Sequence, residues 1–137
     1  MATLEEALIS YLSGFAGLTT LISTRVYHMT KPQTVIYPCI TFQRIDTPRV
    51  HTHDTSGASG DLAYPRIQFD AWADTYASAK AITDQLRAAL NGKKGSIGTA
   101  PNQVTIQSSL VENEQPSFDD LTYKYRSRSD YIVWHLE

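Results

Sequence analysis

The sequence contains a single cysteine, Cys39, so no internal disulfide can form. This excludes a small secreted domain that depends on disulfides, and it fits a protein kept in a reducing cytoplasm. Net charge is also small, −2 from 12 basic and 14 acidic residues. A free-standing nucleic-acid-binding domain usually carries a clear excess of Lys and Arg, which this composition does not indicate.

A long apolar run is missing as well. The uncharged stretch Ala7–Thr24 has six Ser or Thr and two Gly among eighteen residues, which is too polar for a membrane-spanning helix. A signal peptide needs positive charge before its apolar region, and Glu5 and Glu6 stand there instead. We therefore expect no membrane association, and a chain that stays in the compartment that made it.

What is present is the pattern of one ordinary domain over residues 1–137, with 42% hydrophobic residues. A helix is predicted at the N-terminus, where Thr3 and Glu6 form a capping box ahead of residues at helical spacing. A second main helix is predicted from a cap at Asp74 or Thr75 to the Asn91-Gly92 turn. The two apolar stripes are Leu4, Ala7, Leu8, Tyr11, Leu12 and Phe15, and then Ala79, Ile82, Leu86, Ala89 and Leu90. Leu18, Leu21 and Ile22 indicate a short further turn of helix.

Strand patterns occupy the rest of the chain. Arg66–Ala73 alternates cleanly between apolar and more polar residues, which is typical of an antiparallel sheet with one covered face. The other predicted strands are Arg25–His28, Cys39–Ile45, Val104–Val111 and Leu121–Leu136. The fold class is therefore α+β: a mostly antiparallel sheet of four to five strands, with two main helices packed on one face.

Residues 47–63 interrupt this order with a long run rich in Thr, His, Ser, Gly and Asp. Loops of this length are uncommon in compact domains unless they are functional or disordered. We interpret the segment as a flexible arm that becomes ordered against a partner.

The arm also holds the one cluster with metal-like spacing, His51, His53 and Asp54. On an extended chain His51 and His53 point the same way, but no motif marks a third ligand, and a polar loop explains them more simply. Cys39 follows Pro38 ahead of a strand and is interpreted as a structural thiol. Gly57 and Gly60 lack the Lys and the following helix of a phosphate-binding loop. We predict no enzymatic activity, no resident metal and no cofactor.

The last strand changes character along its length. Lys124, Arg126, Arg128 and Asp130 share one face, and the same face continues as Ile132, Trp134 and Leu136. The cations must be exposed to solvent or lie beside acidic groups. The apolar half must be packed on both faces, either by other parts of this chain or by a neighbouring subunit. The predicted interface residues are His51, His53, Asp54, Trp72, Lys124, Arg126, Arg128 and Trp134.

Several segments resemble, in order, a known family. Arg66–Ala73, followed by Asp74-Thr75-Tyr76-Ala77 and an Ala-rich helix, resembles the tail-completion proteins of long-tailed phages and prophages, also called tail terminators or head–tail joining proteins. The similarity extends over nearly the whole chain, although no single motif carries chemistry. Its other segments are Glu5–Leu8, Arg25–Tyr27, Pro38–Ile45 and Asp130–Trp134.

The resemblance implies a function that composition does not. Members of this family form a six-subunit ring that ends growth of the tail tube and joins the tail to the head connector. It therefore implies self-association, contacts with the major tail-tube protein and the head-completion protein, and DNA only in passage through the ring. The protein would reside in the virion after assembly in the host cytoplasm. Nothing in the family assigns a role to residues 47–63, and we expect that arm to lie on the adjacent subunit or on the tube.

Two alternatives remain open from the sequence. Another neck or minor tail component of similar fold is the first, because fold does not fix function. The second is a small nucleic-acid-binding domain that uses Lys124, Arg126 and Arg128. On a regular strand, however, Tyr123 and Tyr125 point away from these cations and could not stack bases beside them.

Overall fold

A computed structural model describes residues 3–30, 36–50, 62–98, 103–121 and 123–136. Within these ranges the chain forms three helices and eight strands, and the fold is α+β. The helices are α1 (Leu4–Ser13), α2 (Ala16–Ile22) and α3 (Tyr76–Leu90). The strands are β1 (Val26–His28), β2 (Cys39–Asp46), β3 (Arg49–Val50), β4 (Leu62–Ala63), β5 (Arg66–Ala73), β6 (Gly95–Ile97), β7 (Val104–Asp119) and β8 (Lys124–Leu136).

The predicted helix starts are confirmed by their caps. The Thr3 hydroxyl accepts a hydrogen bond from the Glu6 backbone N–H at 3.2 Å, and Thr75 does the same for Ser78 at 3.2 Å. Each bond satisfies one of the N–H groups that have no partner inside a helix. At the other end of α3, Gly92 takes the left-handed backbone conformation, with φ +80°, and the Asn91 side chain accepts a hydrogen bond from the Val111 N–H at 3.0 Å. The end of α3 is thereby fixed to β7.

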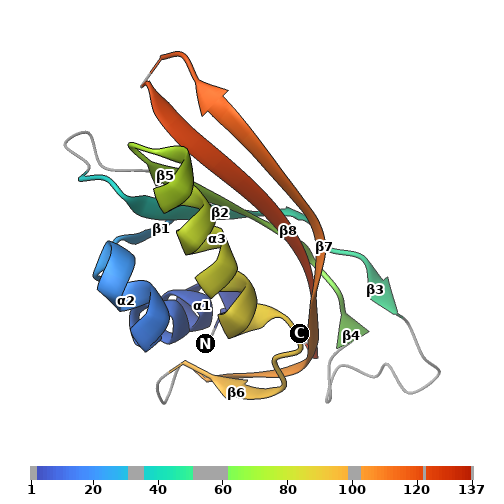
Figure 1. Cartoon of the computed structure of the whole chain (residues 1–137). Coiled ribbons are helices and arrows are strands. Elements are labelled where there is room, and N and C mark those ends of the chain that lie inside the picture. The colour runs from blue at the N-terminus through green and yellow to red at the C-terminus, as the bar shows by residue number, and fades with distance from the viewer. Residues whose placement is uncertain (1–2, 31–35, 51–61, 99–102, 122, 137) are drawn as a thin grey trace.

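All eight strands belong to one curved, mixed sheet. β1 pairs with β2 in parallel, and the other pairs are antiparallel. β8 lies in the middle, with β7 along one side and β5 and then β4 along the other. The three helices cover one face of the sheet, and the far end of the β7–β8 hairpin projects beyond them (Figure 1).

The core lies between the helices and the covered face. Ile67, Phe69, Ala71 and Ala73 of β5 are all buried there, as their alternation predicts. A row of aromatic rings crosses the sheet through Phe69: its centroid lies 5.4 Å from that of Phe42 on β2 and 5.6 Å from that of Tyr131 on β8. The row joins three adjacent strands under the helices.

The two predicted main helices are α1 and α3, and the predicted short turn is α2, but four to five strands proved too few. The missed strands β3, β4 and β6 are two or three residues long, too short to show a periodicity. The predicted strand Val104–Val111 instead continues to Asp119, and Asp120 stands in the turn that follows. β8 begins at Lys124 and not at Leu121.

The segment at 47–63, predicted as a flexible arm, is paired to the sheet at both ends. Arg49 and Val50 pair with Ala63 and Leu62, so β2–β3 and β4–β5 form the two sides of one hairpin. Each side breaks at a proline, Pro48 or Pro65, whose missing N–H interrupts a ladder. The Pro48 carbonyl still accepts from the Tyr64 N–H, and the Pro65 carbonyl from the Val133 N–H. Residues 51–61, and with them His51, His53 and Asp54, lie outside the described residues.

Candidate interaction surface on the outer face of the sheet

The face of the sheet away from the helices carries most of the predicted interface residues. Register places Arg126 opposite Trp72 and Arg128 opposite Asp70, with Asp130 next along β8 opposite Gln68. This outer face has a charged half near the start of β8 and an apolar half near its end, as the alternation predicts.

Charged side chains of this half form ion pairs with groups of the same chain. Lys124 forms an ion pair with Asp74, and its Nζ lies 5.0 Å from the centroid of the Tyr37 ring. The Arg128 Nε lies 3.7 Å from the Asp70 carboxylate. Asp130 accepts a hydrogen bond from the Arg66 guanidinium at 2.9 Å. Lys124 and Arg128 thus meet acidic groups on neighbouring segments, which was one of the two solutions expected for such a row.

Trp72 is only 8% exposed, although it lies on this outer face. Its indole N–H donates a hydrogen bond to the Thr41 hydroxyl at 3.0 Å, and the Arg126 guanidinium lies 5.3 Å from its ring centroid. The polar edge of the ring is therefore satisfied and the cation lies over the ring. A partner would meet Arg126 before it met Trp72.

Asp70 is a carboxylic acid of this half whose pKa is shifted from its ordinary value. Burial raises the pKa of the Asp70 carboxyl above its ordinary value, because the charged form loses solvation. The positive charges of Arg126 and Arg128 act in the opposite direction without cancelling the effect. The carboxylate lines a small pocket of about 140 Å³ together with Met29, Thr41, Phe42, Gln43 and Trp72.

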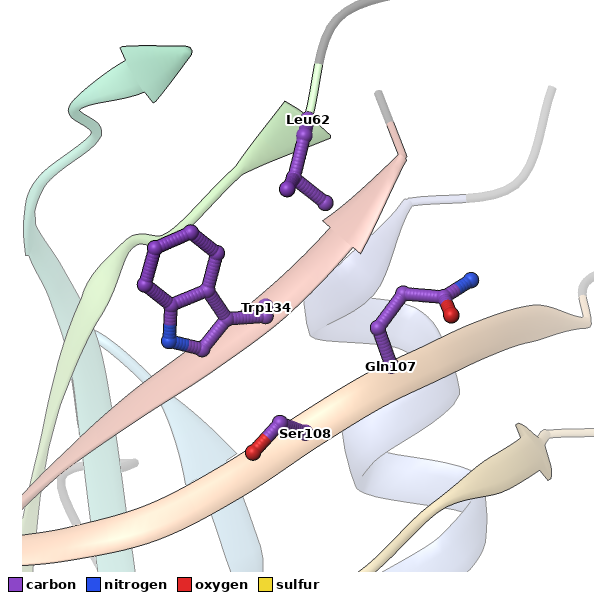
Figure 2. A pocket seen from close by; sticks show the side chains of 4 residues that line it. All are labelled: Leu62, Gln107, Ser108 and Trp134. Atoms are coloured by element: carbon purple, nitrogen blue, oxygen red, sulfur yellow. The ribbon is translucent and has the colours of Figure 1, made fainter.

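The apolar half is an open depression. Leu62, Gln107, Ser108 and Trp134 line a pocket of about 650 Å³, and their side chains come from β4, β7 and β8 (Figure 2). The Trp134 ring stacks on Tyr64, with centroids 4.3 Å apart. Leu110 on β7 is 52% exposed and lies opposite Ile132. Helices cover the inner face of this part of β8, while its outer face remains partly open to solvent.

A second apolar surface, which the sequence analysis did not mark, lies at the tip of the β7–β8 hairpin. Leu121 is 94% exposed and Tyr123 is 76% exposed, and Phe118 and Tyr76 beside them are 44% and 51% exposed. A signal was present in the sequence: a β-turn prefers polar residues, yet the Asp119-Asp120 turn is flanked by Phe118, Leu121 and Tyr123.

The described part of the chain shows no metal-binding arrangement. Cys39 is fully buried at the start of β2. Within the described ranges no group of three or more His, Cys, Asp or Glu side chains could hold a metal ion. None of the described helices combines the length and the apolar character needed to cross a membrane.

Comparison with known families decides the identity. The family model described as "Tail completion protein gp17" matches residues 6–134. The chain belongs to this family. It is a structural tail protein, and the resemblance seen in the sequence is confirmed.

A solved structure agrees with the fold expected of a tail completion protein. One chain of a particle titled "Virion of native gene transfer agent (GTA) particle" superposes with a TM-score of 0.76. The match covers 98% of this chain and 95% of that chain, at 17% sequence identity. At that identity the likeness speaks for the fold alone. Comparison with curated proteins finds no match.

Proposed function

We propose that this tail completion protein caps the tail tube as a ring of identical subunits and joins the finished tail to the head connector. The observation that carries the proposal is the family match over residues 6–134, on a fold shared with a chain of a phage-like virion over 98% of this one. Six copies are the expected number, following the family resemblance. The partners are then the chain itself, the major tail-tube protein and the head-completion protein, assembled in the host cytoplasm.

The surface of the domain supports this proposal over the nucleic-acid alternative. A DNA-binding face needs cations free to neutralise phosphates. Here Lys124 and Arg128 each lie against a carboxylate of the same chain. The outer face instead offers apolar surface at Leu62, Leu110 and Trp134, which suits contact with another protein. In a ring, DNA would only pass through.

Particles made without this protein test the proposal. We expect unjoined heads together with tails of excessive length, seen by negative-stain electron microscopy, and restoration of joined particles when the gene is supplied in trans. Particles that still join heads to tails of normal length would end the proposal. A role as another neck component would instead leave tail length normal while heads stay unjoined.

A labelled-DNA binding assay at several salt concentrations separates the remaining alternative. We expect only weak, non-specific binding, with a dissociation constant no better than roughly 10⁻⁴–10⁻⁶ M at physiological salt. Tighter binding that is abolished by Arg126→Ala and Arg128→Ala together would favour the nucleic-acid reading.

A further inference from the structure

The two apolar surfaces described above lie at opposite ends of one hairpin. The first, here called the tip, consists of Phe118, Leu121 and Tyr123 with Tyr76 beside them. The second, here called the pocket, is lined by Leu62, Gln107, Ser108 and Trp134. In Figure 1 the tip lies at the top, and β4 and the end of β8 lie at the bottom.

The aromatic side chains of the tip are held by contacts within the chain. The Tyr123 N–H donates a hydrogen bond to the Asp119 carbonyl at 2.9 Å, and Tyr123 itself takes a left-handed backbone conformation with φ 55°. The Phe118 ring lies 6.0 Å from that of Tyr123 and 5.0 Å from that of Tyr125. Side chains held in this way lose little freedom on binding, and aromatic anchors of this kind are enriched in interfaces.

The pocket is suited to receive such an anchor. It is open to solvent on the outer face, and at about 650 Å³ it has room for a leucine and an aromatic ring together. Trp134 and Leu62 supply apolar surface, while Gln107 and Ser108 bring polar groups to its rim (Figure 2). Stacking on Tyr64 holds the Trp134 ring in place.

One chain cannot fill its own pocket with its own tip. The two features are separated by the length of β8, which has 13 residues. At about 3.3 Å per residue this is roughly 40 Å of strand paired on both sides. A tip that occupies a pocket therefore belongs to another molecule, and the contact joins two different surfaces. A heterologous contact of this kind leads to a ring or to an open filament.

The area on offer is appropriate for a subunit contact. Taking about 150–250 Å² for a large side chain, the exposed fractions of the tip residues leave roughly 500 Å² to be covered. A standard interface buries about 800 Å² on each partner. The tip would supply more than half of one side, and neighbouring parts of β7 and β8 would supply the rest.

We propose that the tip of one copy inserts into the pocket of the next copy, so that the β7–β8 hairpin links identical subunits head to tail. The occupant of the pocket is thus a second copy of this chain. The inference deepens the proposed function, since it assigns the contact by which the ring would close, and it stands on the self-association part of that proposal.

Cysteine cross-linking tests this contact. Leu121→Cys places a thiol on the tip and Gln107→Cys places one at the pocket; both positions are exposed, and the native Cys39 is fully buried. Under mild oxidation the double variant should give a ladder of disulfide-linked multimers ending in a closed species. Mixing the two single variants should give dimers and nothing larger. The matched control pairs Leu121→Cys with Ala88→Cys, an exposed position on α3, and should give at least tenfold less product.

A charge on the tip provides a second measurement. Leu121→Asp should weaken assembly at least tenfold in sedimentation velocity while leaving the unfolding transition unchanged, because Leu121 is 94% exposed. Asn113→Asp adds the same charge at an exposed position in the middle of β7 and should leave assembly unchanged.

The other outcomes separate failure of this contact from failure of the proposed function. Cross-links formed by the Leu121→Cys single variant would mean that the tips of two copies contact each other. A ladder of multimers that appears only after residues 51–61 are replaced by Asn-Gly would mean that this segment, and not the tip of another copy, occupies the pocket in the intact protein. If the wild-type protein forms rings but the double cysteine variant gives no ladder, the proposed function stands and the subunits meet through a different contact. If the double variant gives the ladder but particles made without the protein have normal tails joined to heads, the contact between copies stands and the proposed function is wrong.

Discussion

The Trp134 ring stacks on Tyr64 across the junction of β8 with β4 and β5, with centroids 4.3 Å apart and ring planes 16° from parallel. Tyr64 stands between β4 and β5, beside the proline that breaks the strand. The stack thus lies at the edge of the pocket, at the point where Pro65 interrupts the strand. A side chain predicted from the sequence as an interface residue is therefore also a structural one.

Loss of this stack should be measurable by fluorescence. Tyr64→Ala removes the ring partner of Trp134, and we expect a cost on the order of 1 kcal/mol in the free energy of unfolding. The emission of Trp134, recorded in a Trp72→Phe background, should shift to the red as the indole gains solvent. Tyr64→Phe keeps the ring and should leave both quantities near wild type. An unshifted spectrum in Tyr64→Ala would mean that other groups hold Trp134.

The aromatic row through the core makes a stronger prediction. Phe69→Ala opens a cavity between the Phe42 and Tyr131 rings and should cost about 3–5 kcal/mol in denaturant unfolding. The same substitution at Phe118, which is 44% exposed on the hairpin tip, should cost less than about 1 kcal/mol. Equal losses at the two positions would contradict the assignment of core and surface.

The raised pKa of Asp70 predicts how stability depends on pH. The folded state holds the Asp70 proton more tightly than the unfolded state, so this group favours folding below its ordinary pKa and loses that contribution as pH rises through the raised folded value. Asp70→Asn removes the buried charge. Its stability relative to wild type should therefore be more favourable at pH 7 than at pH 3, as measured by urea unfolding. A difference that does not change with pH would refute the assignment.

The segment at residues 47–63 can be shortened without disturbing the sheet. Val50 and Leu62 are directly paired, so replacing residues 51–61 by Asn-Gly leaves a two-residue connection of the kind that β-hairpins use. We expect the unfolding free energy to change by less than about 1 kcal/mol. If the segment binds a neighbouring subunit or the tube, the shortened protein should nevertheless fail to cap tails. Normal capping would remove any role for the segment, including one for His51, His53 and Asp54.

The sequence predicted the parts of the fold that depend on local signals. Thr3 and Thr75 cap helices at the predicted positions, and β5 alternates between buried and partly exposed residues as predicted. Both features depend only on the spacing of a few neighbouring residues. The far half of β7 was missed because most side chains of Glu112–Asp119 are polar and exposed, so they show no apolar period.

The candidate surfaces were predicted less completely. The change from charged to apolar along β8 was visible in the sequence, since it follows from alternation within one strand. The partners of its cations were not, because Asp74 and Asp70 are brought to Lys124 and Arg128 only by the pairing of β5 with β8. The exposed hairpin tip depends on where β7 ends, which was placed too early.

The central position of β8 has a consequence for synthesis of the protein. β5 and β7 are hydrogen-bonded to β8 and not to each other, and β8 follows both of them in the chain. Until residues 124–136 have left the ribosome, the two halves of the sheet have no common strand, and the tip and the pocket do not yet exist as surfaces. If copies assemble through the tip and the pocket, we therefore expect a chain truncated before residue 124 to lack both surfaces and to stay out of the assembly.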